Sequence, residues 1–210
     1  MNKQVKSLKR KFILNGAVAV SQALVLAGVG LWAITSPSRA LEKNEIAAAS
    51  LRNHMMSDMM HDALRGDVLA AMQAGSTNDV AAYQSAQEDL NEHVETFKEM
   101  FAANNALDLS ADVRGALNDV QEPLDAYIAS AVPIVDLAGR DPAAARRDFP
   151  AFAVRFGELE EVMEAAGDTI ETNLAAATNA ARRLGVIALT AMVVALIAGV
   201  VIASGVGVLV

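Results

Sequence analysis

The chain has 210 residues, a formal net charge of −8 and no cysteine, so disulfides and thiolate metal sites are excluded. Hydrophobic residues make up 53% of the chain but aromatic residues only 4%, a balance typical of helical bundles rather than sheets. All 25 acidic residues lie between two apolar stretches, and this acidic body argues against nucleic acid as a partner. The sequence contains no nucleophile–base pair, phosphate-binding loop or HExxH pattern, so we expect neither an enzyme nor a cofactor.

The N-terminal segment is a basic run followed by an apolar stretch. Residues 1–11 hold five basic residues and no acidic one. Residues 12–34 have the length of about 20 residues that a membrane-spanning helix needs. A cleaved signal peptide is the alternative, because Ser38-Arg39-Ala40 has suitable small residues, but signal-peptide cores are shorter, about 7–15 residues. We therefore expect an uncleaved membrane helix at 12–34 and, from the positive charge, a cytoplasmic N-terminus.

Three turn signals divide the region between the apolar stretches into four helical segments. They are GSTND at 75–79, NNALDLSAD at 104–112 and AGRDP at 138–142. In the first, glycine follows one helix and Thr77 or Asn78 caps the next. In the second, Ser110 is the predicted N-cap. In the third, Asp141 is the predicted N-cap and Pro142 the first helical residue.

The lengths of these segments predict how they are arranged. Two outer segments of about 40 residues, each about 60 Å long, flank two shorter inner ones. This pattern predicts an all-α fold in which residues 35–183 form an up-down-up-down periplasmic four-helix bundle, continuous with the membrane helices.

Apolar residues recur in steps of three and four along the last three segments, the spacing of a bundle seam. The seams are Tyr83, Leu90, Val94, Phe97 and Phe101; Val113, Leu117, Val120, Leu124, Tyr127, Ala131 and Ile134; and Phe152, Phe156, Leu159, Met163, Ala166, Ile170 and Leu174. Pro123 and Pro133 should bend the third segment, and Pro150 should kink or restart the fourth.

The C-terminal stretch, residues 184–210, is uncharged and long enough to cross a bilayer. Beyond Pro150 no proline or turn signal separates it from the preceding seam, so one helix is expected to leave the bundle and enter the membrane. Gly199, Ala203 and Gly207 place a small residue at every fourth position, which can let membrane helices approach closely.

This architecture and the run LDAYIASAVPIVDLAGRDPAAARRDFPAFAVRFGELEEVMEAAGDTIE at 124–171 resemble the four-helix sensory region of bacterial methyl-accepting chemotaxis receptors. The resemblance covers nearly the whole chain. It implies an inner-membrane receptor module that senses a periplasmic ligand or partner. Such receptors continue into a HAMP module and a kinase-controlling coiled coil, whereas this sequence ends at Val210. It is therefore read as a fragment or as a truncated receptor.

A polar row on the first long segment is the main candidate for binding. His54, Asp58, His61 and Arg65 fall within an arc of about 60° on one helix face. Antiparallel pairing about the first turn places His93 level with His61, which predicts that these two side chains lie within reach. The groups can form a ligand pocket, and acid should then destabilise the buried histidine pair.

The same row offers metal ligands. His54, Asp58, His61 and His93 suit zinc, copper or nickel, and the run Met55, Met56, Met59 and Met60 adds soft thioethers for copper(I). The competing interpretation is that the methionines fill the core and that the row is a solvated or dimer-contact face.

Arginines are the other binding candidates, because a guanidinium grips a carboxylate bidentately. Arg65 and Arg155 lie at bundle height, whereas Arg146 and Arg147 lie near the distal tip. The alternative is that they are surface charges paired with the excess of Asp and Glu.

From these observations we expect a sensory module with the membrane as a partner and with a second copy in a homodimer. A small-molecule ligand, full-length chemoreceptors or a downstream signalling region are further expected partners, and nucleic acid is not. A periplasmic metal-binding bundle and a truncated accessory protein that pairs with full-length receptors are the alternatives.

Overall fold

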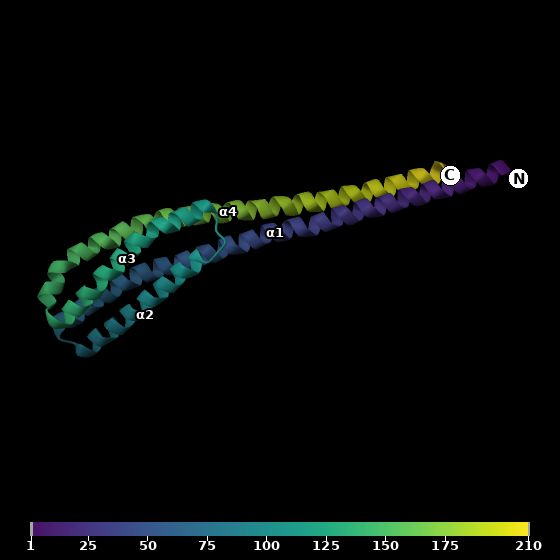
Figure 1. The fold of residues 1–210 in the computed structure, drawn as a ribbon. Helices are drawn as coiled ribbons and strands as arrows, with labels where there is room; N and C mark the ends of the chain where they lie inside the picture. The colour runs from purple at the N-terminus through teal and green to yellow at the C-terminus, as the bar shows by residue number, and fades with distance from the viewer. Residues whose placement is uncertain (1, 210) are drawn as a thin grey trace. The chain divides into compact units, whose positions relative to one another are not determined.

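A computed structural model of the chain consists of four helices, and the described residues contain no strand (Figure 1). It describes the backbone of residues 2–209 and the side chains of residues 13 and 15–202. The helices are α1 (Asn2–Thr77), α2 (Val80–Asn105), α3 (Ala111–Arg140) and α4 (Pro142–Leu209). The chain divides into two compact units. Unit 1 comprises Met1–Asn44 and Ala177–Val210, and unit 2 comprises Glu45–Ala176. The basic side chains of 1–11, and those of Ala203 and Gly207, lie outside the described side chains.

The first turn lies slightly later than the glycine predicts. Helix α1 continues through Gly75 to Thr77, and Asn78 adopts the left-handed conformation with φ 56°. The N-cap of α2 is Asp79, whose carboxylate accepts a hydrogen bond of 3.0 Å from the Ala82 amide. The prediction of Thr77 or Asn78 as the cap is therefore wrong. Asn tolerates the left-handed turn position, and Asp is an equally good cap.

The other two turns are as the sequence predicts. The Ser110 hydroxyl accepts a hydrogen bond from the Val113 amide and caps α3. The Asp141 carboxylate accepts hydrogen bonds from Ala143 and Ala144, and α4 begins at Pro142. Helix α4 does not restart at Pro150, and α3 is likewise uninterrupted at its two prolines.

One hydrophobic core in unit 2 contains buried side chains from all four helices. The three predicted seams are confirmed, with only Tyr83, Val94 and Leu174 half-buried. Helix α1 adds apolar side chains near its end and polar ones before them. Its buried or half-buried positions in steps of three and four are Ala47, Ser50, His54, Ser57, His61, Leu64, Val68 and Ala71. Because apolar burial is the main stabilising term, the later, apolar part of this seam (Leu64, Val68 and Ala71) contributes more to the stability of the core than the earlier, polar part.

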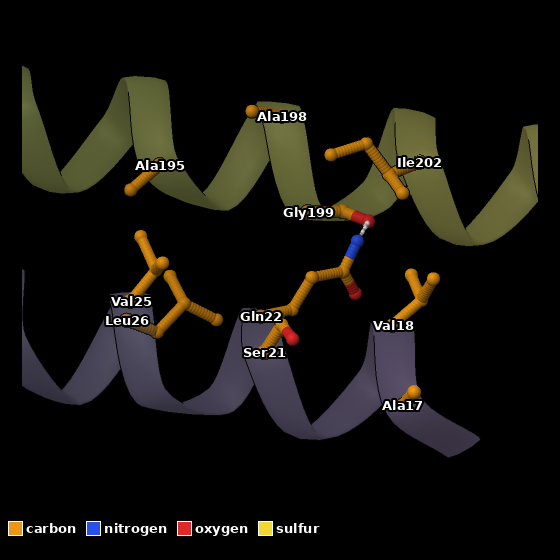
Figure 2. Close-up of a pocket in the computed structure, with 10 residues that line it drawn as sticks. All are labelled: Ala17, Val18, Ser21, Gln22, Val25, Leu26, Ala195, Ala198, Gly199 and Ile202. Atoms are coloured by element: carbon orange, nitrogen blue, oxygen red, sulfur yellow. Dashed lines mark hydrogen bonds between the residues drawn. The ribbon is translucent and has the colours of Figure 1, made fainter. Parts of the chain in front are cut away.

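Unit 1 contains two helical segments that are long and apolar enough to cross a membrane. They are the early part of α1 and the late part of α4, and most of their large apolar side chains are exposed, as a lipid environment allows. Figure 2 shows Gln22 of α1 reaching α4, where its amide donates to the Gly199 carbonyl at 3.4 Å. A groove of about 410 Å³ surrounds this bond, lined mostly by small and aliphatic side chains. Thr178 of α4 also donates to Asn44 of α1 at 2.6 Å.

Two glycines permit close helix contact at the end of unit 2 that holds the α1–α2 turn. A Cβ atom at Gly75 of α1 would overlap the backbone carbonyl of Ala138 in α3. A Cβ atom at Gly139 would lie 2.5 Å from the ring of Tyr83, whose hydroxyl donates to the Val135 carbonyl. At these positions the missing side chain is required by packing rather than by backbone conformation.

Gly75→Ala should therefore lower the free energy of unfolding by at least about 1–3 kcal/mol, because a backbone atom cannot move aside as a side chain can. Gly115→Ala is the matched control, since a Cβ there meets nothing within 4 Å, and it should stabilise α3 by about 0.5–1 kcal/mol. Urea unfolding of the full chain in detergent micelles, followed by circular dichroism, measures both. Equal effects of the two substitutions would contradict the close contact.

Candidate functional site

His61 is buried, with 2% of its surface exposed, where α1 meets α3 and α4. Its Nε2 lies 3.1 Å from the Phe156 carbonyl oxygen, and its ring stacks on the Phe156 ring with centroids 4.0 Å apart. The Tyr127 hydroxyl of α3 donates to the His61 carbonyl at 2.9 Å. Because a carbonyl only accepts, the neutral His61 ring carries its proton on Nε2. His61 thus connects α1 to α4 through its side chain and to α3 through its backbone carbonyl.

Burial governs the electrostatics of this cluster. Desolvation lowers the pKa of His61, opposed by its bond to the Phe156 carbonyl and by the carboxylates of Asp62, Asp58 and Glu160. Burial also raises the pKa of the Tyr127 hydroxyl. Both side chains are therefore held in their uncharged forms, as expected in an apolar site.

His54 lies one heptad earlier on α1, against a glycine of α4. A Cβ atom at Gly167 would come within 2.9 Å of its Nε2, so the glycine makes room for the imidazole. Desolvation lowers the pKa of His54, opposed mainly by Asp58. An open groove of about 450 Å³ borders this contact, lined by Leu51, His54, Met55, Asp58, Glu160, Met163, Glu164, Gly167, Asp168 and Glu171.

His93 does not pair with His61 as the sequence predicts; it bonds Asp67 of α1, with Nδ1 and Oδ2 2.7 Å apart. The partner of His93 lies six residues further along α1 than predicted (67 − 61), or about 9 Å. The later end of α1, at Thr77 rather than Gly75, accounts for part of this shift, and the His61 ring contacts α4 and α3 instead of His93. Asp67 is buried, and desolvation raises the pKa of its carboxyl while His93 lowers it. The pair joins α1 to α2, away from α4.

The two predicted arginines lie close to this region but hold no common ligand site. The Arg65 guanidinium lies 4.6 Å from the centroid of the Phe156 ring, a cation–π contact. Arg155 is half exposed and pairs with Glu158 on the same helix at 2.6 Å. Arg146 and Arg147 are exposed. The arrangement of Arg155 fits the interpretation as a surface charge paired with an acid.

The candidate metal ligands do not converge. Among the residues that the structure describes, no group of three or more His, Asp or Glu side chains is placed to hold a metal ion. His61 and His93 have other partners, and Met55 and Met59 are each 60% exposed and contribute little to the core. Met60 alone of the four packs against the core.

Sequence reasoning missed three functional groups of this region: the Phe156 carbonyl, the Tyr127 hydroxyl and Asp67. A signal for the first two was present, because His54 and His61 are seven residues apart and Ser50 and Ser57 continue the same heptad pattern. That spacing places the histidines on a bundle seam, where α4 and α3 must supply their partners. No pattern in the sequence marks Asp67.

Comparison with known proteins finds no family model, no curated protein and no solved structure that matches this chain. The resemblance to chemotaxis receptors therefore remains a prediction.

Phe156→Ala should lower the free energy of unfolding by about 3–5 kcal/mol, because it empties a packed site and removes the ring on which His61 and Arg65 rest. Val154→Ala, on an exposed side of the same helix, is the control and should change stability by less than about 0.5 kcal/mol. The free energy is obtained from urea unfolding of the full chain in micelles. A loss below about 1 kcal/mol at Phe156 would mean that the cluster contributes little to stability.

Proposed function

We propose that this chain is the sensory module of a transmembrane signalling protein of the chemotaxis-receptor type. In this proposal unit 2 lies in the periplasm of a bacterial inner membrane, and a stimulus there shifts α4 relative to α1. The observation that supports it most is that α1 and α4 each belong to both units. Each helix supplies buried side chains to the core of unit 2 and an exposed apolar surface to unit 1. Because each of these helices is uninterrupted, its backbone hydrogen bonds can carry a displacement along the helix axis from unit 2 into unit 1.

The proposal includes an up-down-up-down order of the helices in unit 2. Short connections favour it, since only Asn78 and Asp79 separate α1 from α2 and only Asp141 separates α3 from α4. Contacts between α1 and α4 favour an antiparallel pair. His54 lies at Gly167 while the later residue His61 lies at the earlier residue Phe156.

The proposal places the stimulus at the contact between α1 and α4. The groove beside His54 is lined by residues of these two helices, which are also the two that continue into unit 1. A stimulus acting there acts directly on the pair that would transmit it. A homodimer and a downstream signalling region complete the proposed assembly, and both rest on the resemblance described above.

Reporter fusions test the orientation of the chain. Alkaline phosphatase joined after Glu45 should be active, because that enzyme folds only outside the cytoplasm, and a fusion after Lys11 should be inactive. The basic run before the first span is the physical reason for this expectation. Activity at Lys11 with inactivity at Glu45 would reverse the orientation and remove the periplasmic assignment.

A hybrid with a chemoreceptor signalling region joined after Val210 tests the output. The chain has no cysteine, so a cysteine pair gives a clean cross-link. We expect oxidation of the pair Asp58→Cys and Glu160→Cys, which line the same groove, to change kinase activity at least about twofold. The single-cysteine variants are the controls and should not respond to oxidation. A full cross-link with unchanged kinase activity would contradict the proposed transmission.

A further inference from the structure

The His61 side chain of α1 lies in the contact with α4, and the proposed function depends on this helix pair. It is the only one of the three histidines that is buried, and it makes its side-chain contacts with α4 and α3. In its neutral form, Nε2–H donates to the Phe156 carbonyl and the flat ring stacks on the Phe156 ring. The hydrogen bond to the Phe156 carbonyl favours the charged ring, but the burial of the imidazole disfavours a charge there, and burial has the larger effect.

Protonation at Nδ1 would change the charges around Phe156. The Phe156 ring would then contact two cations, the imidazolium of His61 and the Arg65 guanidinium, which lies 4.6 Å from the centroid of that ring. The carboxylates that act on His61 are Asp58 and Asp62 from α1 and Glu160 from α4. The Tyr127 ring of α3 contacts the imidazole, and the Arg65 guanidinium of α1 contacts the same Phe156 ring on which His61 stacks. Both aspartates and the glutamate are exposed, so solvent screens the attraction that they offer to a buried cation.

We propose that the proton is a stimulus for this module and that uptake of a proton by His61 weakens the contact between α1 and α4 in unit 2. The link from this contact to a signal rests on the proposed function. The weakening of the contact itself does not.

The direction of the pH effect follows from the burial of His61. Burial lowers the pKa of His61 below its ordinary value of 6.5, so the unfolded chain binds this proton more readily than the folded one. The stabilising contribution is present above about pH 6.5 and is lost as the pH falls below it toward the folded-state pKa. His54 acts in the same direction.

Asp67 acts in the opposite direction, because burial raises the pKa of its carboxyl and acid then favours the folded state. Overall melting therefore mixes several effects, and the test needs measurements at single residues.

The first measurement is a pH titration of the full chain in micelles with ¹³C-labelled histidine. The chain has three histidines, and the variants His54→Gln, His61→Gln and His93→Gln assign the three signals. The His61 signal should titrate below pH 6.5. Titration of His61 at or above 6.5 would overturn the proposal.

The second measurement is the distance between nitroxide labels at Met59→Cys on α1 and Val154→Cys on α4, two exposed positions of unit 2. Between pH 8 and pH 5 the distance distribution should shift and broaden. Because His54 also contacts α4, the comparison is made in a His54→Gln background. There the substitution His61→Phe, which keeps a ring but cannot titrate, should abolish the shift, as should His61→Gln. His93→Gln is the matched control and should keep the shift, because His93 contacts Asp67 rather than α4.

An unchanged distribution across this pH range would overturn the proposal, as would the same shift in His61→Phe. If a variant fails to fold, the titration and the distance measurement on the chain with native His61 still decide. Neither measurement requires the chain to signal. If the label distance responds to pH but cross-linking leaves the kinase activity of the hybrid unchanged, the weakening of the α1–α4 contact is upheld and the sensory function is rejected. If cross-linking changes the kinase activity but the distance does not respond to pH, the sensory function stands and the proton proposal is rejected.

Discussion

The core of unit 2 depends on a seam of α1 that is polar over half its length. A buried polar atom without a partner costs about 1–3 kcal/mol. Ser57 meets this need within α1, through the Asn53 carbonyl, whereas His61 bonds the Phe156 carbonyl of α4 and accepts from the Tyr127 hydroxyl of α3. Hydrophobic contacts tolerate small shifts in register, whereas the two bonds of His61 do not. The polar part of the seam therefore fixes how α1, α3 and α4 align.

The sequence predicted the apolar seams of the fold better than its turns. The last three helical segments have apolar seams, and every residue predicted for these seams is buried or half-buried, although the prediction left out further buried positions such as Ala86, Ile128 and Val135. Two of the three caps, Ser110 and Asp141, were predictable because each follows a residue that caps poorly, Leu109 or Arg140. Before α2 the run Ser76-Thr77-Asn78-Asp79 offers four residues that can cap, so the sequence did not single out Asp79. The register between α1 and α2 was not predictable, because Gly75 permits a helix end without requiring one. Its absent side chain is needed for contact with Ala138 instead.

The candidate site was predictable in composition but not in partners. The row of His54 and His61 was recognisable, and its importance for packing follows from the heptad spacing. The heptad spacing indicates that His61 needs a partner from a neighbouring helix, but that partner is a backbone carbonyl, which every residue has, so the sequence does not mark which residue supplies it. His93 and Asp67 pair through a register that depends on one turn. Local periodicity therefore identifies buried faces, while contacts between distant segments need the three-dimensional structure.

The hydrogen bond from Gln22 to Gly199, one of two described between α1 and α4 in unit 1, has a consequence for movement within that unit. The next carbonyl on the same face of α4 lies one turn away, about 5.4 Å along the axis. A slide of α4 must therefore either stay small enough to keep the 3.4 Å bond or give it up until a full turn has passed. Interhelical bonds in membranes average only about 0.6 kcal/mol, close to the thermal energy. The Gln22 bond by itself therefore gives α1 and α4 only a weak preference for one register within unit 1, to which the bond from Thr178 to Asn44 adds.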